Sequence, residues 1–200
     1  MQSLLRLRHP AVCIIDVAGF AVALGLVIIF RPSFITAVLP LAIALQYLVS
    51  LVHHAMPFTA LRSKLDRGVI FLVIGATYVP YWGNLLPAPE AWARLPWVGV
   101  CVVVGLCLVY FGAPEKVNGV FYALFASAGL VISFYELQQW LPPAGLAAFW
   151  LGTALYAASQ VAYEARRPDP LPKLFGYRGV QHLLLFAATT IGSVVAILYT

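Results

Sequence analysis

The stretch AVCIIDVAGFAVALGLVIIF, residues 11–30, decides the fold class of this chain. Its only charged residue is Asp16, and its length matches the roughly 20 residues with which a helix crosses a hydrocarbon layer about 30 Å thick. The apolar core of a secretory signal is shorter, about 7–15 residues, and no small-x-small cleavage site follows here. The stretch is therefore predicted to be a transmembrane helix of the mature protein.

The composition extends this prediction to the whole chain. Of its 200 residues, 62% are hydrophobic and only 10% are charged, which is more apolar surface than a soluble domain of this length can bury. We expect a single polytopic membrane domain, residues 1–200, with membrane lipids as its surroundings. The net charge of +5 is modest, and basic residues in a membrane protein set its orientation, so no nucleic-acid partner is implied.

Seven apolar runs, separated by charged residues, Pro and Gly, predict an all-α bundle of seven transmembrane helices. Each run is about 17–23 residues long, enough to span the membrane as a helix. The predicted spans are residues 11–30, 34–56, 68–86, 96–112, 117–138, 144–164 and 179–199.

The basic residues indicate how this bundle is oriented. Of the 12 lysines and arginines, all but Arg31 and Arg94 fall on the same predicted side as the N-terminus. Because cytoplasmic loops are enriched in Lys and Arg, this bias predicts a cytoplasmic N-terminus and an external C-terminus. The short loops favour a bacterial inner membrane. The basic residues on the predicted cytoplasmic side are Arg6, Arg8, Arg62, Lys64, Arg67, Lys116, Arg166, Arg167, Lys173 and Arg178.

This orientation brings several polar side chains to one depth near the cytoplasmic face. His54 lies at the end of the second span, Asp66 just before the third, and His182 one turn inside the last. Polar residues at such a depth usually face the bundle interior and mark a working site. The expected set is Ser50, His54, Asp66, Arg178 and His182, with Asp16 of the first span as a further neighbour.

The spacing of this set fits two interpretations. Two histidines from different helices, with a carboxylate and a hydroxyl nearby, suit a zinc ion that keeps an open position for water. Interfacial histidines beside a structural pair of Asp66 and Arg178 fit the same spacing. His53 projects about 100° away from His54 on a helix and is expected at the membrane interface.

Four segments carry a family resemblance. Ser50-Leu-Val-His-His54 contains a Ser-x-x-x-His element, and Phe175-Gly-Tyr-Arg-Gly-Val-Gln-His182 opens the last span with a pattern close to FGxHxxxH. Residues 64–80, KLDRGVIFLVIGATYVP, place a Leu-Asp pair before an apolar run with a TYTP-like ending, and residues 147–163 are rich in small residues and Tyr. Taken in their order along the chain, the four segments resemble the hemolysin III family, which is related to the progestin/adipoQ (adiponectin) receptors and to alkaline ceramidases.

The resemblance implies seven helices, a cytoplasmic N-terminus and a zinc ion near the inner leaflet. Carried over by position, it implies that His54 and His182 are zinc ligands and that Asp66 and Ser50 lie beside the metal. The first histidine of the family's final HxxxH is Arg178 here, and a guanidinium cannot ligate zinc because it stays protonated and has no available lone pair. Either zinc is retained on His54 and His182 with Asp66 coordinating directly, or the metal is lost and Arg178 pairs with Asp66.

Two functions follow from these two outcomes. With zinc, the resemblance to ceramidases implies a membrane hydrolase of lipid amides, with Asp66 as general base and Ser50 holding the attacked oxygen. Without zinc, the chain is expected to be a non-catalytic membrane protein that is receptor-like, binds lipid or joins a larger complex. A retinal protein is disfavoured because Lys64, Lys116 and Lys173 all fall in predicted loops.

Overall fold

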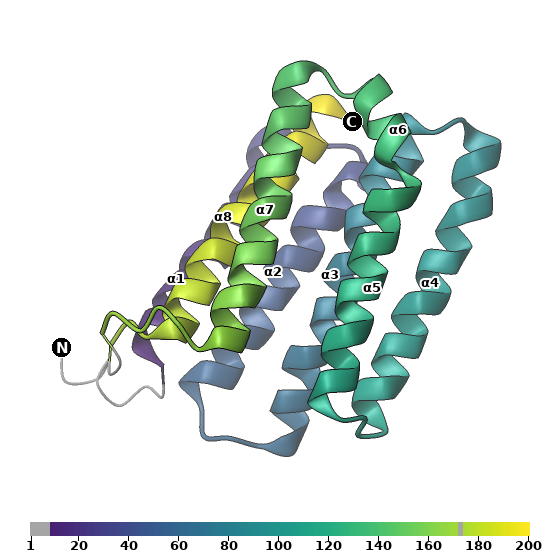
Figure 1. Ribbon diagram of the computed structural model, residues 1–200. Coiled ribbons are helices and arrows are strands. Elements are labelled where there is room, and N and C mark those ends of the chain that lie inside the picture. Colours follow the sequence, from purple (N-terminus) through teal and green to yellow (C-terminus); the bar gives the residue numbers. More distant parts are fainter. Residues whose placement is uncertain (1–8, 172–173) are drawn as a thin grey trace.

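The computed structural model describes residues 9–171 and 174–200, which form a bundle of α-helices with no β-strand beyond one isolated bridge (Figure 1). The all-α prediction is confirmed. Three of the basic residues that indicated orientation, Arg6, Arg8 and Lys173, lie outside the described ranges. The helices are α1 (Pro10–Phe30), α2 (Phe34–Ala55), α3 (Ala60–Leu85), α4 (Ala88–Tyr110), α5 (Glu115–Ile132), α6 (Phe134–Trp140), α7 (Pro143–Ala165) and α8 (Tyr177–Tyr199).

Helices α2 and α3 form the centre of the bundle. Helix α2 packs against α1, α3 and α8, while α3 also packs against α4 and α5. Figure 1 shows α1, α7 and α8 on one side of this pair and α4 and α5 on the other. Helix α7 packs chiefly on α8, so the two halves of the bundle meet mainly through α2, α3 and α8.

Six of the described helices, α1, α2, α3, α4, α5 and α8, are long and apolar enough to cross a membrane. Helix α7 was predicted as a further span, and its 23 residues match the others in length. It is absent from the six because Gly, Ser, Gln, Tyr and Glu lower its mean hydropathy. The prediction of seven spans is therefore supported for six helices and stays a prediction for α7.

Helices α3 and α4 each begin 8 residues before their predicted spans, at residues 60 and 88 rather than 68 and 96. Helix α3 begins at Ala60, where the side chain of Thr59 accepts a hydrogen bond from the backbone N–H of Arg62 at 3.2 Å. Helix α4 begins directly after Pro87, and Pro96, where the span was predicted to begin, lies inside it.

The predicted span 117–138 is interrupted at Ser133, which ends α5 and precedes the short helix α6. The buried hydroxyl of Ser133 accepts a hydrogen bond from the indole N–H of Trp82 on α3. This contact fixes the junction between α5 and α6 against the centre of the bundle.

Two contacts fix α1, α2 and α8 against one another beside their polar ends. A Cβ atom at Gly19 would lie 2.5 Å from the ring of Tyr47, so only glycine permits this close approach of α1 to α2. The hydroxyl of Tyr47 lies 2.9 Å from that of Thr189, which ties α2 to α8. The relative positions of these three helices are therefore set by packing one to two turns from the polar cluster described next.

Candidate metal centre

All 4 histidines of the chain meet at one end of the bundle. His54 is at the centre of the group, with ring centroids 5.2 Å from those of His9 and His182 and 4.9 Å from that of His53. Two imidazoles on one tetrahedral zinc ion have centroids about 5 Å apart, given a Zn–N distance of about 2.0–2.1 Å. The spacing of the rings around His54 is therefore compatible with imidazoles that share a metal ion, and it is also the ordinary distance of edge-to-face ring contacts.

Helix boundaries place these side chains together. Helix α2 ends at Ala55 before Met56 and Pro57, so His53 and His54 occupy its last turn. Helix α1 begins at Pro10, which puts His9 at its N-cap, and α8 begins at Tyr177, which puts His182 in its second turn. Three helix ends that are distant in sequence thus contribute one imidazole or more each.

His53, His54 and Asp66 form the tightest group of ligating side chains among the described residues. Their donor atoms all lie within 4.8 Å of one another. Donor atoms around one zinc ion lie about 3.3 Å apart, so the side chains need to close by roughly 1.5 Å to hold an ion. Two imidazoles and a carboxylate are a common donor set for catalytic zinc, so the group fits that metal.

The prediction that His53 lies at the membrane interface was wrong. Its side chain is 7% exposed, because the segment after α2 folds back and places the ring of Phe58 6.3 Å from that of His53. His9 was not selected from the sequence at all. The signal for it was positional, since His9 directly precedes the first apolar run on the side where the other histidines were expected.

Asp16, which is fully buried, and His182, which is partly buried, form a pair that joins α1 to α8. The Nδ1 atom of His182 lies 2.9 Å from Oδ1 of Asp16, and the Asp16 side chain is 0% exposed. Asp16 was expected near the site, and the structure places it against a residue of the cluster. His182 contacts the ring of His54, whereas the tightest ligating group contains His53 in its place.

Arg178 forms no ion pair with Asp66 within the described ranges, which contradicts the pairing considered for a metal-free site. Its Nε donates to the hydroxyl of Tyr177 at 3.3 Å, and its guanidinium lies over the Tyr177 ring at 5.9 Å. The cation–π contact with the neighbouring ring takes the place of a carboxylate partner. Arg178 therefore cannot ligate a metal and makes no direct ion pair with Asp66 in this arrangement.

Three buried polar atoms of the cluster have no hydrogen-bond partner among the described residues: Nδ1 of His54, Oγ of Ser50 and Oδ2 of Asp16. Leaving such an atom unsatisfied costs about 1–3 kcal/mol. Ser50 lies one turn before His54 on the same face of α2, so two of these atoms are close in space. Atoms of this kind gathered beside a donor cluster indicate a site that binds a polar ligand or an ion.

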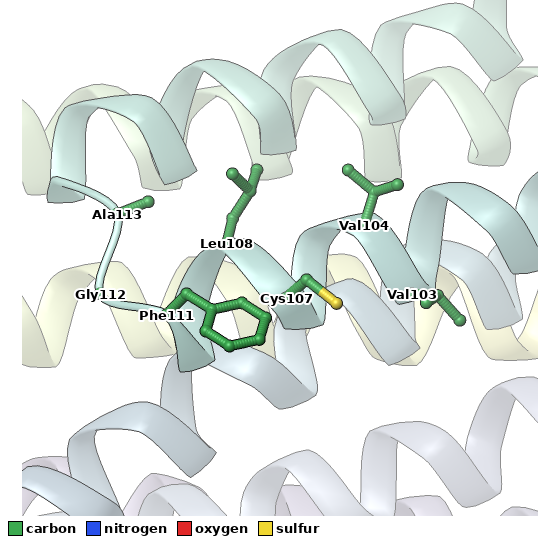
Figure 2. A pocket seen from close by; sticks show the side chains of 7 residues that line it. All are labelled: Val103, Val104, Cys107, Leu108, Phe111, Gly112 and Ala113. Carbon is green, nitrogen blue, oxygen red and sulfur yellow. The ribbon is translucent and has the colours of Figure 1, made fainter.

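Two surface hollows differ in their relation to this site. One, of about 480 Å³, is lined by Cys13, Ile14 and Val17 of α1 and by Leu51, Val52, Ala55 and Met56 of the α2 end, where Val52 and Ala55 flank His53 and His54 in the sequence. The other lies along the end of α4 (Figure 2) and contains no residue of the cluster. Its lining residues are Val103, Val104, Cys107, Leu108, Phe111, Gly112 and Ala113.

The comparison with known families covers nearly the whole chain. A family model described as Haemolysin-III related matches residues 7–194. This range includes all 4 histidines, helices α1 to α7 and most of α8, which ends at Tyr199. The chain is an integral membrane protein and belongs to the haemolysin-III-related family.

Proposed function

We propose that this protein is a zinc-dependent membrane hydrolase of lipid amides. The observation that carries the proposal is the convergence of all 4 histidines with Asp66 and Asp16 in a partly buried cluster that has unsatisfied polar atoms among the described residues. His54, His182 and Asp66 would hold the ion in this proposal, which leaves the fourth tetrahedral position to water. The imidazole of His53 packs beside that of His54. A bound zinc ion supplies polarisation of a carbonyl group and activation of water.

The residues of the chain have separate tasks in this proposal. Asp66 has two carboxylate oxygens, so one can bind the ion while the other accepts the proton of the attacking water as general base. Ser50, whose buried Oγ has no partner in the described ranges, donates a hydrogen bond to the attacked carbonyl oxygen. Both side chains lie near His54: Ser50 is one turn away on α2, and the donor atoms of Asp66 and His54 are within 4.8 Å.

A lipid substrate is supported by the surface beside the cluster. The hollow of about 480 Å³ between α1 and the end of α2 has an apolar lining and adjoins His53, His54 and Asp16 in sequence. An acyl chain held there would place its polar head next to the donor atoms. We assign the hollow to the acyl chain and the cluster to the amide.

We further propose that α7 is the seventh span and that the N-terminus is cytoplasmic, in a bacterial inner membrane. The bias of basic residues toward the end that carries the histidines supports this orientation. The site then lies in the inner leaflet.

The test is the metal content of the purified protein, measured by elemental analysis after mild zinc repletion. We expect about one zinc ion per chain in the wild type and in Ser133→Ala, a control at a buried hydroxyl remote from the cluster. The variants His54→Ala and Asp66→Ala are expected to lose it. A wild-type protein without zinc would refute the hydrolase, whereas zinc-dependent release of fatty acid from lipid amides would complete the case for it.

A second candidate function, a metal-free lipid-binding protein, is favoured by one observation. Arg178 stands where the resemblance implies a ligating imidazole, and its charge opposes a nearby cation. In this case the purified protein carries no zinc but retains bound lipid, and lipid extraction with mass spectrometry identifies it. The zinc content of the purified protein therefore distinguishes the two candidate functions.

A further inference from the structure

Asp16 is a carboxylate inside an otherwise apolar membrane helix. It is completely buried, and it is the only Asp, Glu, Lys or Arg within α1. A charged group within a membrane span costs several kcal/mol unless it has a partner. Its partner among the described residues is His182, which lies 166 positions later in the chain.

The contact between Asp16 and His182 fixes the imidazole. His182 uses Nδ1 in the 2.9 Å contact with Asp16, which leaves Nε2 as the nitrogen that can bind a metal. The ring of His182 stands edge-on to that of His54, with an interplanar angle of 86°. Histidines that ligate metals almost always engage a carboxylate, carbonyl or water through their other nitrogen, and the pair has this arrangement.

Asp16 is not placed in α1 to act as the counter-ion of Arg178. Arg178 forms no ion pair with Asp16 in the described part of the chain, and its guanidinium lies against Tyr177 instead. The second oxygen of Asp16 is also buried without a hydrogen bond in these ranges, so the carboxylate is not simply satisfied by its surroundings. Among the described residues, the ion-pair geometry thus ties Asp16 to His182 of the histidine cluster.

We infer that Asp16 is a positioning residue of the metal centre: it orients His182 so that this imidazole binds the ion together with His54. The inference rests on the proposed metal centre and adds a residue of the first helix to it. Asp16 does not touch the ion in this arrangement but acts through His182. Its effect must therefore depend on the presence of the His182 imidazole.

The first test measures the zinc affinity of the purified full-length protein by competition with a chelating dye at fixed pH. Asp16→Asn keeps the shape of the side chain but removes its charge and one acceptor oxygen. We expect zinc to bind about 10- to 100-fold more weakly, the usual effect of losing a carboxylate behind a ligating histidine. Ser133→Ala, which alters a buried polar residue remote from the cluster, is expected to bind zinc like the wild type.

A double-mutant cycle separates positioning from a general charge effect. In the His182→Ala background, where His53, His54 and Asp66 remain as donors, Asp16→Asn is expected to cause no further loss of zinc affinity. The same loss in both backgrounds would show that Asp16 acts through its charge alone and would overturn the inference. An unchanged affinity of Asp16→Asn in the wild-type background would overturn it as well.

A second variant covers the case in which Asp16→Asn does not fold. Asp16→Glu keeps the charge but moves the acceptor by one methylene group, and we expect zinc to bind severalfold more weakly than to the wild type. Unchanged zinc affinity of Asp16→Glu would overturn the inference. Failure of the proposed function has a different result, since the wild-type protein itself would then bind no zinc.

Discussion

The two ends of the bundle differ in how far their polar groups are hydrogen-bonded. At the end remote from the histidines, Trp82 donates to Ser133, and Arg94 reaches Glu136 at 2.9 Å and Glu90 at 3.4 Å. At the histidine end, buried atoms of His54, Ser50 and Asp16 have no hydrogen-bond partner among the described residues. At the first end these polar groups join helices, whereas at the second, beside the contact of Asp16 with His182, several buried polar atoms have no partner in the described ranges.

This comparison makes a general point about buried polar residues. A satisfied polar group rigidifies the fold, and its loss is measured as stability. An unsatisfied group costs stability and is retained for another reason, so its loss is measured as binding. Variants at the two ends should therefore fail in different assays.

The largest expected effect is that of His54→Ala at the histidine end. Because the rings of three other histidines surround His54, we expect zinc affinity to fall by at least about 100-fold, or about 2.7 kcal/mol. The thermal midpoint of the metal-free protein is expected to fall as well, because loss of a buried ring leaves a cavity, so zinc affinity is the deciding quantity. Competition with a chelating dye and thermal unfolding in detergent measure the two quantities. Loss of stability with unchanged zinc affinity would mean that His54 has a structural role and does not bind the metal.

The next effect belongs to the remote end. Trp82→Phe removes the indole donor and leaves the buried hydroxyl of Ser133 without its partner, so we expect destabilisation by about 1–3 kcal/mol. Zinc affinity is expected to stay at the wild-type value. Chemical unfolding followed by circular dichroism checks the first part. An equal loss in zinc affinity would show that the two ends are coupled.

A smaller effect of opposite sign is expected for Ser50→Ala. Its hydroxyl is buried and unpartnered in the described ranges, so its removal should raise the free energy of unfolding of the metal-free protein by about 1 kcal/mol. The unfolding midpoint with and without lipid amide measures the change. If Ser50→Ala destabilises the metal-free protein, then the hydroxyl is already bonded and the contrast between the two ends weakens.

The smallest effect is expected for Glu136→Gln. The ion pair with Arg94 is partly exposed at a helix end, and pairs of this kind contribute about 0–1 kcal/mol. We expect a loss within this range that diminishes in high salt, because the charges are screened. Unfolding at low and high salt checks this. A loss that persists in high salt would mean that Arg94 acts through its contact with Trp82 rather than through charge.

The sequence predicted the helices well because each depends on a local property. Length and continuous apolarity identified the six helices that are apolar enough to cross the membrane, and Pro10 and Pro57 coincide with ends that the structure confirms. Prediction was weaker where a helix depends on its partner. Helix α7 is less apolar and lies on α8, and the break at Ser133 depends on a contact from α3.

The sequence predicted at which level of the bundle the site residues lie, but it did not predict which of their side chains contact one another. Spacing placed His54, Asp66 and His182 near one level, since rise per residue fixes depth along a helix. It could not give the rotation of one helix against another, which decides that His182 contacts Asp16 and that Arg178 turns to Tyr177. His53 was misplaced for the same reason, because the segment after α2 covers a face that the helix alone would expose.

The gathering of every histidine into one cluster has a practical consequence for spectroscopy. With only 4 imidazoles in the chain and all of them around His54, histidine-selective isotope labelling gives a magnetic resonance spectrum without background from the rest of the protein. Each ring signal then reports on its tautomer and neighbours within the cluster. Ion, lipid and detergent can be exchanged one at a time, and the response of the centre can be observed in the intact protein.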